Sequence, residues 1–259
     1  MIYVGDDFLS TYKTKAVILK TQDYKENDKI IWLFTEKIGK ITAIAKGAKK
    51  NKSKFLSSTL PFCFGEFVIY RGKSMYLINE VQIIHSFGEF LEDLEMLTYA
   101  SYLNELIDIA LLEEESNREL FRQVVTAYYL MKSKVGDVET LVRTFEIKLL
   151  NLTGYGLNLE NCCVCGKKIN SSNYINFAYG GGVCNECNKQ NGMALTNTAY
   201  NVLKILSNFP LEKVHRISVK EETKKQLYKV LSGFIMENFQ KTPKSLDMLN
   251  VFKEVNKNE

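Results

Sequence analysis

The first 85 residues alternate between short apolar runs and polar turns. Branched and aromatic side chains gather in five runs, a pattern typical of β-strands. Five short strands joined by turns predict a small closed barrel. We expect Trp32 and Cys63 to pack inside it, the cysteine as a small buried hydrophobic residue. The five runs are residues 16–19, 30–34, 41–45, 66–70 and 75–84.

Beyond Gly88 the apolar period changes from about two residues to about 3.6, which indicates helices. The stripe from Leu103 to Leu111 predicts a helix over about 89–112. Asn117 is expected to cap the next helix, and Gly154 to end a third one.

Three further signals mark the helices of the last 65 residues. A threonine, Thr196 or Thr198, begins a helix that Pro210 stops. The sequence from Ser218 to Glu221 matches a capping box before a final long helix. Gly233 lies inside that helix, where it costs roughly 1 kcal/mol relative to alanine.

These patterns divide the chain into an N-terminal barrel domain, residues 1–85, and a helical domain, residues 86–259. Residues 1–13 have mixed character and are expected to form a head that is either loosely held or added to the edge of the sheet. A cysteine-rich module at about 160–190 interrupts the helices. The predicted fold class is therefore α+β, with a barrel followed by an α-helical domain that carries an inserted module.

Charge is distributed unevenly along the chain. Residues 1–80 hold 14 basic and 8 acidic side chains, a net charge of +6, whereas residues 81–259 hold 20 and 22, a net charge of −2. The asymmetry indicates that the N-terminal domain faces a polyanion. No apolar run reaches the ~18 residues of a membrane span, and the N-terminus does not resemble a secretory signal. Six cysteines without such a signal predict the reducing cytoplasm.

Lysines concentrate between the third and fourth predicted strands, with no acidic residue among them. A hairpin tip adds two further cations and two aromatic rings. Lysine binds phosphate as a point charge and aromatic rings stack on bases, so the pattern predicts nucleic-acid binding with little sequence preference. The candidate residues are Lys46, Lys49, Lys50, Lys52 and Lys54 in the loop, and Tyr70, Arg71, Lys73 and Tyr76 at the hairpin.

Two other interpretations of these residues stay open. A run of charges is often only a solvated loop, and rings on a hairpin are as often cross-strand packing as a stacking platform. If all five loop lysines neutralise phosphates, the logarithm of the affinity for single strands falls with the logarithm of the salt concentration, with a slope of about −3.5.

Four cysteines in two pairs form the most specific motif of the chain. Cys162 and Cys165 are followed, after 18 intervening residues, by Cys184 and Cys187. Two C-x2-C pairs at this spacing are typical of zinc sites with four sulfur ligands. Four thiolates leave no open coordination position, so one structural zinc ion is expected rather than a catalytic one. Cys163 is interpreted as a bystander, because a pair with one intervening residue makes a poor turn around a metal.

Enzymatic motifs are missing from the sequence. Phe67 stands where a phosphate-binding Walker A motif would need its first glycine before Gly72-Lys73-Ser74. Neither a G-x-G-x-x-G nor a G-x-S-x-G motif occurs. No acid or nucleophile near the two histidines, His85 and His215, marks either as catalytic. We therefore do not expect an enzyme.

Taken together, the residues resemble the RecO family of recombination mediators. The similarity runs over about residues 14–250, and the order and spacing of its pieces are specific. Two departures are the long head before Thr14 and the additional Cys163. The pieces are Lys15–Lys20, Tyr24–Ile30, Leu33–Thr35, Gly39–Ile41, Ala45–Lys49, Pro61–Phe62, Gly65–Phe67, Tyr70–Gly72, Glu92–Leu94, Tyr99–Tyr102, Glu105–Leu106, Cys162–Gly166, Cys184–Cys187 and Lys244–Leu246.

The resemblance implies an N-terminal OB-fold barrel and a helical domain with a zinc module. It also implies binding of single- and double-stranded DNA, annealing of complementary strands, and loading of RecA with the help of RecR and in some bacteria RecF. The resemblance further implies that RecA is loaded onto DNA covered by single-stranded-DNA-binding protein, and that the protein is located in the cytoplasm, at the nucleoid. Candidates for contact with the acidic end of that protein are Arg118, Arg122, Arg143 and Lys148.

Two rival functions remain at this point. The first is an RNA-binding protein of transcription or translation with an OB-fold and a zinc ribbon, which would favour RNA through contacts to the 2′-hydroxyl group. The second is an interaction scaffold whose lysine loop contacts only protein.

Overall fold

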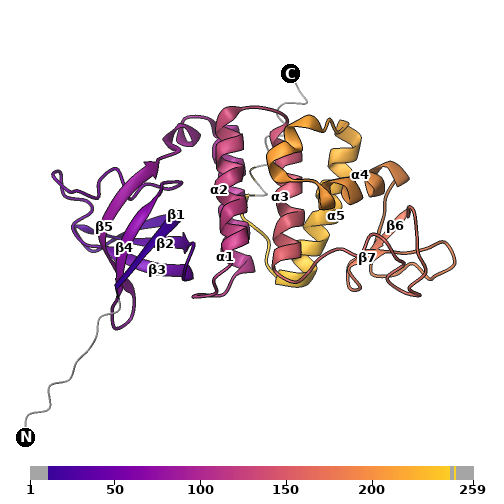
Figure 1. Cartoon of the computed structure of the whole chain (residues 1–259), viewed down its shortest axis with the longest axis horizontal. Coiled ribbons are helices and arrows are strands. Elements are labelled where there is room, and N and C mark those ends of the chain that lie inside the picture. Colours follow the sequence, from indigo (N-terminus) through magenta and orange to yellow (C-terminus); the bar gives the residue numbers. More distant parts are fainter. Residues whose placement is uncertain (1–10, 246–247, 249–259) are drawn as a thin grey trace, which may run out of the picture. The chain divides into compact units, whose positions relative to one another are not determined.

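The computed structural model describes residues 11–245 and 248, and the chain in it forms two compact units (Figure 1). The barrel unit comprises the chain up to Asp93 together with Leu112–Phe121. The helical unit comprises Leu94–Leu111 and the chain from Arg122 onward. Residue 85 ends the last barrel strand, but the barrel unit also includes residues 86–93 and 112–121.

Five strands form the closed barrel that the alternating pattern predicts, in the order β1-β2-β3-β5-β4, with β1 and β4 closing the circle. Neighbouring strands are antiparallel except for β3 and β5, which are parallel. The predicted OB-fold barrel is therefore confirmed. Its strands are β1 (Thr11–Tyr24), β2 (Asp28–Thr35), β3 (Gly39–Ala45), β4 (Phe64–Arg71) and β5 (Tyr76–His85).

Two sequence predictions about the barrel need correction. Residues 11–13 are not part of a loose head, because β1 begins at Thr11 and pairs with β4 from there; residues 1–10 lie outside the described part of the chain. Trp32 does not pack inside. Side chains alternate between the two faces of a strand, and Ile31 and Leu33 fill the core, so Trp32 points outward and is half-exposed.

Cys63 is buried in the barrel core, as predicted. Burial raises the pKa of its thiol to about 11, so the side chain is neutral and behaves as an apolar residue.

The segment 112–121 packs on the barrel at the β2–β3 turn. Gly39 adopts a left-handed φ of +88°, and a Cβ atom there would lie 2.1 Å from the carbonyl oxygen of Glu115. Phe121 meets Phe34 edge to face, with 5.6 Å between ring centroids. This end of the outer face of β2 and β3 is therefore covered.

All five predicted helices are present, and two of them, the first and the last, begin later in the chain than the sequence indicated. The first begins at Leu94 rather than near residue 89, because Gly88–Leu91 form a short 3-10 turn, η1, that buries Phe90 against Phe62 in the barrel unit. The helices are α1 (Leu94–Ala110), α2 (Arg118–Ser133), α3 (Val138–Leu152), α4 (Asn197–Asn208) and α5 (Glu221–Phe239), with a 3-10 turn, η2 (Leu211–Arg216), before α5.

Two predicted helix caps are confirmed and one is wrong. The Asn117 side chain accepts the N–H of Leu120 at 2.9 Å, and Thr196 accepts that of Ala199 at 3.1 Å. The capping box at Ser218 is not formed, because α5 begins two residues later than that box requires, with Lys220 at its N-cap and no side-chain cap.

Gly233 in the middle of α5 has a packing role that the sequence did not indicate. A Cβ atom at this position would lie 2.4 Å from the ring of Phe177, which instead packs edge to face on Phe234 at 5.3 Å. None of the helices among the described residues combines the length and the apolar character needed to cross a bilayer.

Asp137 is a point at which the stability of the helical unit is expected to depend on pH. Its carboxylate accepts the N–H of Thr140 at 2.8 Å, capping α3, and pairs with the buried Lys224 at 3.1 Å. Partial burial opposes ionisation, but the hydrogen bonds from Thr140 and the charge of Lys224 outweigh it and hold the pKa of Asp137 below its usual value.

An Asp137→Ala variant is therefore expected to lose about 1 kcal/mol of unfolding free energy at neutral pH. Asp137→Asn retains a cap acceptor and loses only the charge. A carboxylate with a lowered pKa stabilises the fold above its unfolded pKa, and this contribution disappears as pH falls through the folded value. Urea unfolding at neutral pH and near pH 3 is expected to show a smaller difference in stability between wild type and Asp137→Asn in acid than at neutral pH. A difference that grows in acid would contradict the assignment.

Candidate metal centre and nucleic-acid interface

The cysteine module lies between α3 and α4 and is built on a small sheet of three short strands in the order β7-β6-β8. In Figure 1 β6 and β7 lie at the end of the helical unit beside α4 and α5. The strands are only two or three residues long, so backbone pairing alone gives the module little stability. The strands are β6 (Tyr174–Asn176), β7 (Gly181–Gly182) and β8 (Gly192–Ala194).

Four cysteine sulfurs lie close together in this module. The Sγ atoms of Cys162, Cys165, Cys184 and Cys187 all lie within 4.8 Å of one another. The N–H of Cys184 donates to the sulfur of Cys162 at 3.3 Å, as expected where backbone turns wrap around a charged thiolate. The structure thus brings together the four predicted ligands. Cys163 is not among them, since its thiol instead lies 3.6 Å from the carbonyl oxygen of Gly181.

The pKa values of two cysteines indicate that this cluster of sulfurs suits a positive charge at its centre. Burial opposes ionisation of Cys162, but N–H donors from Cys184, Cys165 and Val164 outweigh it and lower its pKa to about 6. Hydrogen bonds to Cys165 and Cys184 favour the protonated form of Cys187 and raise its pKa to about 12. In the absence of an ion, the thiol of Cys187 therefore keeps its proton and donates it to the neighbouring sulfurs. A bound metal ion would replace this proton as the positive charge between the sulfurs. Four soft thiolate donors suit zinc, and with all positions taken by protein such an ion would be structural.

The basic loop begins against the turn between β1 and β2. The N–H of Gly47 donates to the carboxylate of Asp28 at 2.8 Å, and the N–H of Lys49 donates to the carbonyl of Asn27 at 3.0 Å. The ammonium of Lys49 pairs with Asp23 at 2.8 Å. Lys49 is therefore partly neutralised by the protein itself.

Four of the five loop lysines are exposed and carry no ion pair among the described residues, and one of these four, Lys54, borders a hollow that also holds carboxylates. The other three are Lys46, Lys50 and Lys52. Because their ammonium groups have no carboxylate partner there, these side chains are the ones most able to meet phosphates.

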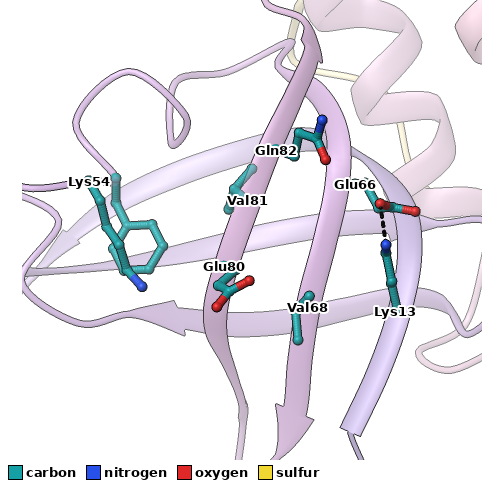
Figure 2. A pocket seen from close by; sticks show the side chains of 8 residues that line it. Lys13, Lys54, Glu66, Val68, Glu80, Val81 and Gln82 are labelled. Atoms are coloured by element: carbon teal, nitrogen blue, oxygen red, sulfur yellow. Dashed lines mark ion pairs between the residues drawn. The ribbon is translucent and has the colours of Figure 1, made fainter.

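Lys54 lies apart from them, at a hollow of about 230 Å³ on the outer face of β1, β4 and β5 (Figure 2). Its ammonium sits 5.1 Å from the ring centroid of Phe55. Across the hollow Lys13 pairs with Glu66 at 2.8 Å, and this hydrogen bond raises the pKa of Lys13. Glu80 adds a second carboxylate. A hollow with charges of both signs is a poor phosphate site, so Lys54 contributes less to a basic surface than its neighbours in the sequence.

The hairpin between β4 and β5 also differs from the simple pattern. Arg71 pairs with Glu114 at 3.1 Å, and the hydroxyl of Tyr76 donates to the same carboxylate at 3.0 Å. Burial, followed by this carboxylate, raises the pKa of Tyr76 to about 12. Tyr76 is 6% exposed and belongs to the barrel core, so it packs across the strands and does not offer an open ring for a base. Tyr70 is half-exposed on β4, and Lys73 is exposed at the tip.

Sequence reasoning missed one residue of this surface, Trp32. It faces outward from β2, and the ammonium of Lys20 on β1 lies 5.0 Å from its ring centroid. Strict alternation with the buried Ile31 and Leu33 was the signal that could have placed it outside the core.

The basic residues proposed for a partner on the helices do not form one exposed set. Arg143 is 1% exposed and pairs with the buried Glu146 at 2.9 Å, between the rings of Tyr102 and Tyr228. Burial alone would lower the pKa of Arg143, but the carboxylate of Glu146 outweighs it and the net shift is upward.

The remaining three differ in their surroundings. Arg122 pairs with Glu212 at 2.6 Å, and Lys148 donates to the carbonyl of Ser207 at 2.8 Å. Arg118 is exposed. Arg143, by contrast, is a core residue whose charge is paired inside the helical unit, so the prediction that it contacts a partner is wrong.

Comparisons with known proteins agree over both parts of the chain. Residues 9–87 match the family model described as Recombination protein O N terminal, and residues 91–247 match Recombination protein O C terminal. The chain is 56% identical over 256 residues to the DNA repair protein RecO of Clostridium novyi (strain NT), which covers 99% of this chain and 100% of that protein. It is 55% identical over 246 residues to the protein of the same name from Clostridium acetobutylicum, covering 95% and 100%. The corresponding protein of Alkaliphilus metalliredigens is 32% identical over 248 residues, covering 94% and 99%.

Proposed function

Because the chain belongs to the RecO family of DNA repair proteins, we propose that its part in repair is that of a non-catalytic recombination mediator, which binds single- and double-stranded DNA and anneals complementary strands. The observation that carries the DNA-binding part is the loop after β3, where Lys46, Lys50 and Lys52 are exposed and unpaired by described carboxylates. An OB-fold barrel with a basic loop beside its β1–β2 turn suits a single strand.

Annealing follows from the kind of contact that lysines make. Ammonium groups bind phosphate oxygens and leave base edges free, so two strands held in this way keep their bases available for pairing. Partial neutralisation of the phosphates also reduces the repulsion between the strands. Neither step needs a nucleotide cofactor.

The partners belong to the same proposal. Membership of the family supports cooperation with RecR, and in some bacteria RecF, to load RecA onto DNA that single-stranded-DNA-binding protein covers. Membership of the family also supports a location of the protein in the cytoplasm, at the nucleoid. The zinc ion we propose for the four cysteines would hold the small sheet of the module in its folded form and would take no part in a reaction.

The charge pattern of the loop gives a quantitative expectation. With Lys49 paired to Asp23 and Lys54 placed beside two carboxylates, about three lysines remain for phosphates. The expected slope of log affinity against log salt for single strands is then about −2 from this loop, smaller in size than five lysines would give.

An RNA-binding role is the second candidate, and a competition separates the two. Labelled DNA is displaced by unlabelled DNA or RNA of one sequence, with fluorescence anisotropy as the measurement. The proposal predicts that DNA competes at least as well as RNA, because lysine–phosphate contacts gain nothing from a 2′-hydroxyl. A preference of about tenfold or more for RNA would favour the rival.

A further inference from the structure

The outer face of the barrel carries a partly apolar strip that crosses several strands. Trp32 on β2 lies directly opposite Lys20 on β1 and Thr42 on β3. In the next row Ile30 lies opposite Ile44, which in turn lies opposite Leu77 on β5. The four apolar side chains, Ile30, Trp32, Ile44 and Leu77, are all half-exposed.

The two sides of Trp32 carry opposite charges, one ammonium group and one carboxylate. On the β1 side, Lys20 is exposed and has no carboxylate partner among the described residues; its ammonium lies over the indole ring at 5.0 Å. On the β3 side, the hydroxyl of Thr42 donates to the carboxylate of Glu113 at 2.8 Å. A phosphate backbone is attracted on the first side and repelled on the second.

The start of β2 lies beside the basic loop, because Lys29 on β2 pairs with Ala45, the last residue of β3 before the loop. Trp32 lies four residue steps along β2 from Asp28, about 13 Å of strand, which is the span of a few nucleotides. Asp28 holds the first residues of the loop, since its carboxylate accepts the N–H of Gly47. One short strand of nucleic acid can therefore reach both the indole ring and the exposed lysines.

We propose that Trp32 stacks on an unpaired base of a single strand while Lys20 leaves the ring and meets the adjoining phosphate. The inference rests on the DNA binding proposed above and adds a preference to it. A base inside a duplex has no free face for an indole ring, so the contact favours single strands over double strands. The competing explanation is that Trp32 only covers the sheet by packing against its cross-strand neighbours.

Trp32 is the only tryptophan of the chain, so the intrinsic emission of the full-length protein reports on this residue alone. Oligothymidylate of about 12 nucleotides, within the site size of one OB-fold, is titrated into the protein. The expected result is a loss of tryptophan emission that saturates together with the anisotropy of the same oligonucleotide carrying a dye. Anisotropy that saturates without any change in emission overturns the stacking and leaves the proposed DNA binding intact. Absence of binding in both signals at low salt overturns both.

Two variants complete the test. Trp32→Leu keeps an apolar side chain on the strip and is expected to weaken the affinity for the single strand about 5- to 150-fold, the range for loss of one stacked base. Trp32→Phe keeps a ring and is expected to retain most of the wild-type affinity for the single strand. Both variants are expected to bind duplex DNA with an affinity within about twofold of wild type. If Trp32→Leu does not fold, the tryptophan emission of the wild-type protein and the affinity of Trp32→Phe still test whether the ring stacks on a base. Equal single-strand affinity for wild type and Trp32→Leu would overturn the proposal.

Discussion

Replacing Cys184 with serine is expected to remove the metal from the four-cysteine cluster and to unfold the module around it. A serine oxygen is a poor substitute for a thiolate, and the three remaining sulfurs would keep a crowded site without its cation. Structural zinc contributes about 10–16 kcal/mol of binding free energy in small zinc-finger peptides at neutral pH, and that energy is folding energy for a module with such short strands. The measurements are elemental analysis, with about one zinc ion per chain expected for wild type and none for the variant, and limited proteolysis.

Cys163→Ser is the matched control for this prediction. The residue is a direct neighbour of Cys162, but its sulfur is outside the cluster and lies against the carbonyl of Gly181. This variant is expected to keep its zinc and its resistance to protease between residues 160 and 195. A Cys184→Ser protein that retained one zinc ion and full protease resistance would contradict the assignment of the cluster as a structural metal site.

Changing Lys46, Lys50 and Lys52 together to alanine is expected to reduce both DNA affinity and its dependence on salt. The three ammonium groups are exposed, so their removal does not disturb the barrel core. Each phosphate contact contributes about 0.7 to the salt slope for single strands, so the slope is expected to become shallower by about 2. The measurement is fluorescence anisotropy of labelled single-stranded DNA at several salt concentrations.

A variant with the same change in charge elsewhere controls for the overall charge of the protein. Lys213, Lys225 and Lys229 are exposed on the helical unit, and their combined replacement by alanine is expected to leave the salt slope within about 0.5 of wild type. If both triple variants lowered affinity equally, the effect would come from net charge and the loop would lose its special role.

Local patterns made the cysteine cluster and the barrel predictable. Two residues between paired cysteines allow one backbone turn to present both sulfurs to a single ion, wherever the pair lies in the fold. Alternating apolar runs indicated the strands for a similar reason, because each strand buries one face against the same core.

Trp32 was misplaced because its strand is apolar on both faces. Ile31 and Leu33 fill the core, while Ile30, Trp32 and Phe34 lie on the outer face, and Phe34 is then covered by Phe121. A run of apolar residues does not reveal which half points inward when both halves are apolar. The assignment depends on the neighbouring strands, which the sequence of one strand does not contain.

The other surprises depend on contacts between residues far apart in the chain. Glu113, Glu114 and Glu115 look like an ordinary solvated run, yet they meet Thr42, Arg71 and the backbone at Gly39. The ion pair of Arg71 and the hydrogen bond from the hydroxyl of Tyr76, both with Glu114, follow from that long-range docking. No periodicity near residue 71 or residue 114 could have indicated it, so the hairpin appeared more available to DNA than it is.

Annealing of two complementary DNA oligonucleotides, one of them covered by single-stranded-DNA-binding protein, tests the central claim most directly. Wild type, the loop triple variant and the helical-unit triple variant are compared at one salt concentration. We predict that wild type and the helical-unit variant accelerate annealing and that the loop variant does so much less. Equal acceleration by all three would contradict the role of Lys46, Lys50 and Lys52, and absence of acceleration by wild type would contradict the mediator function itself.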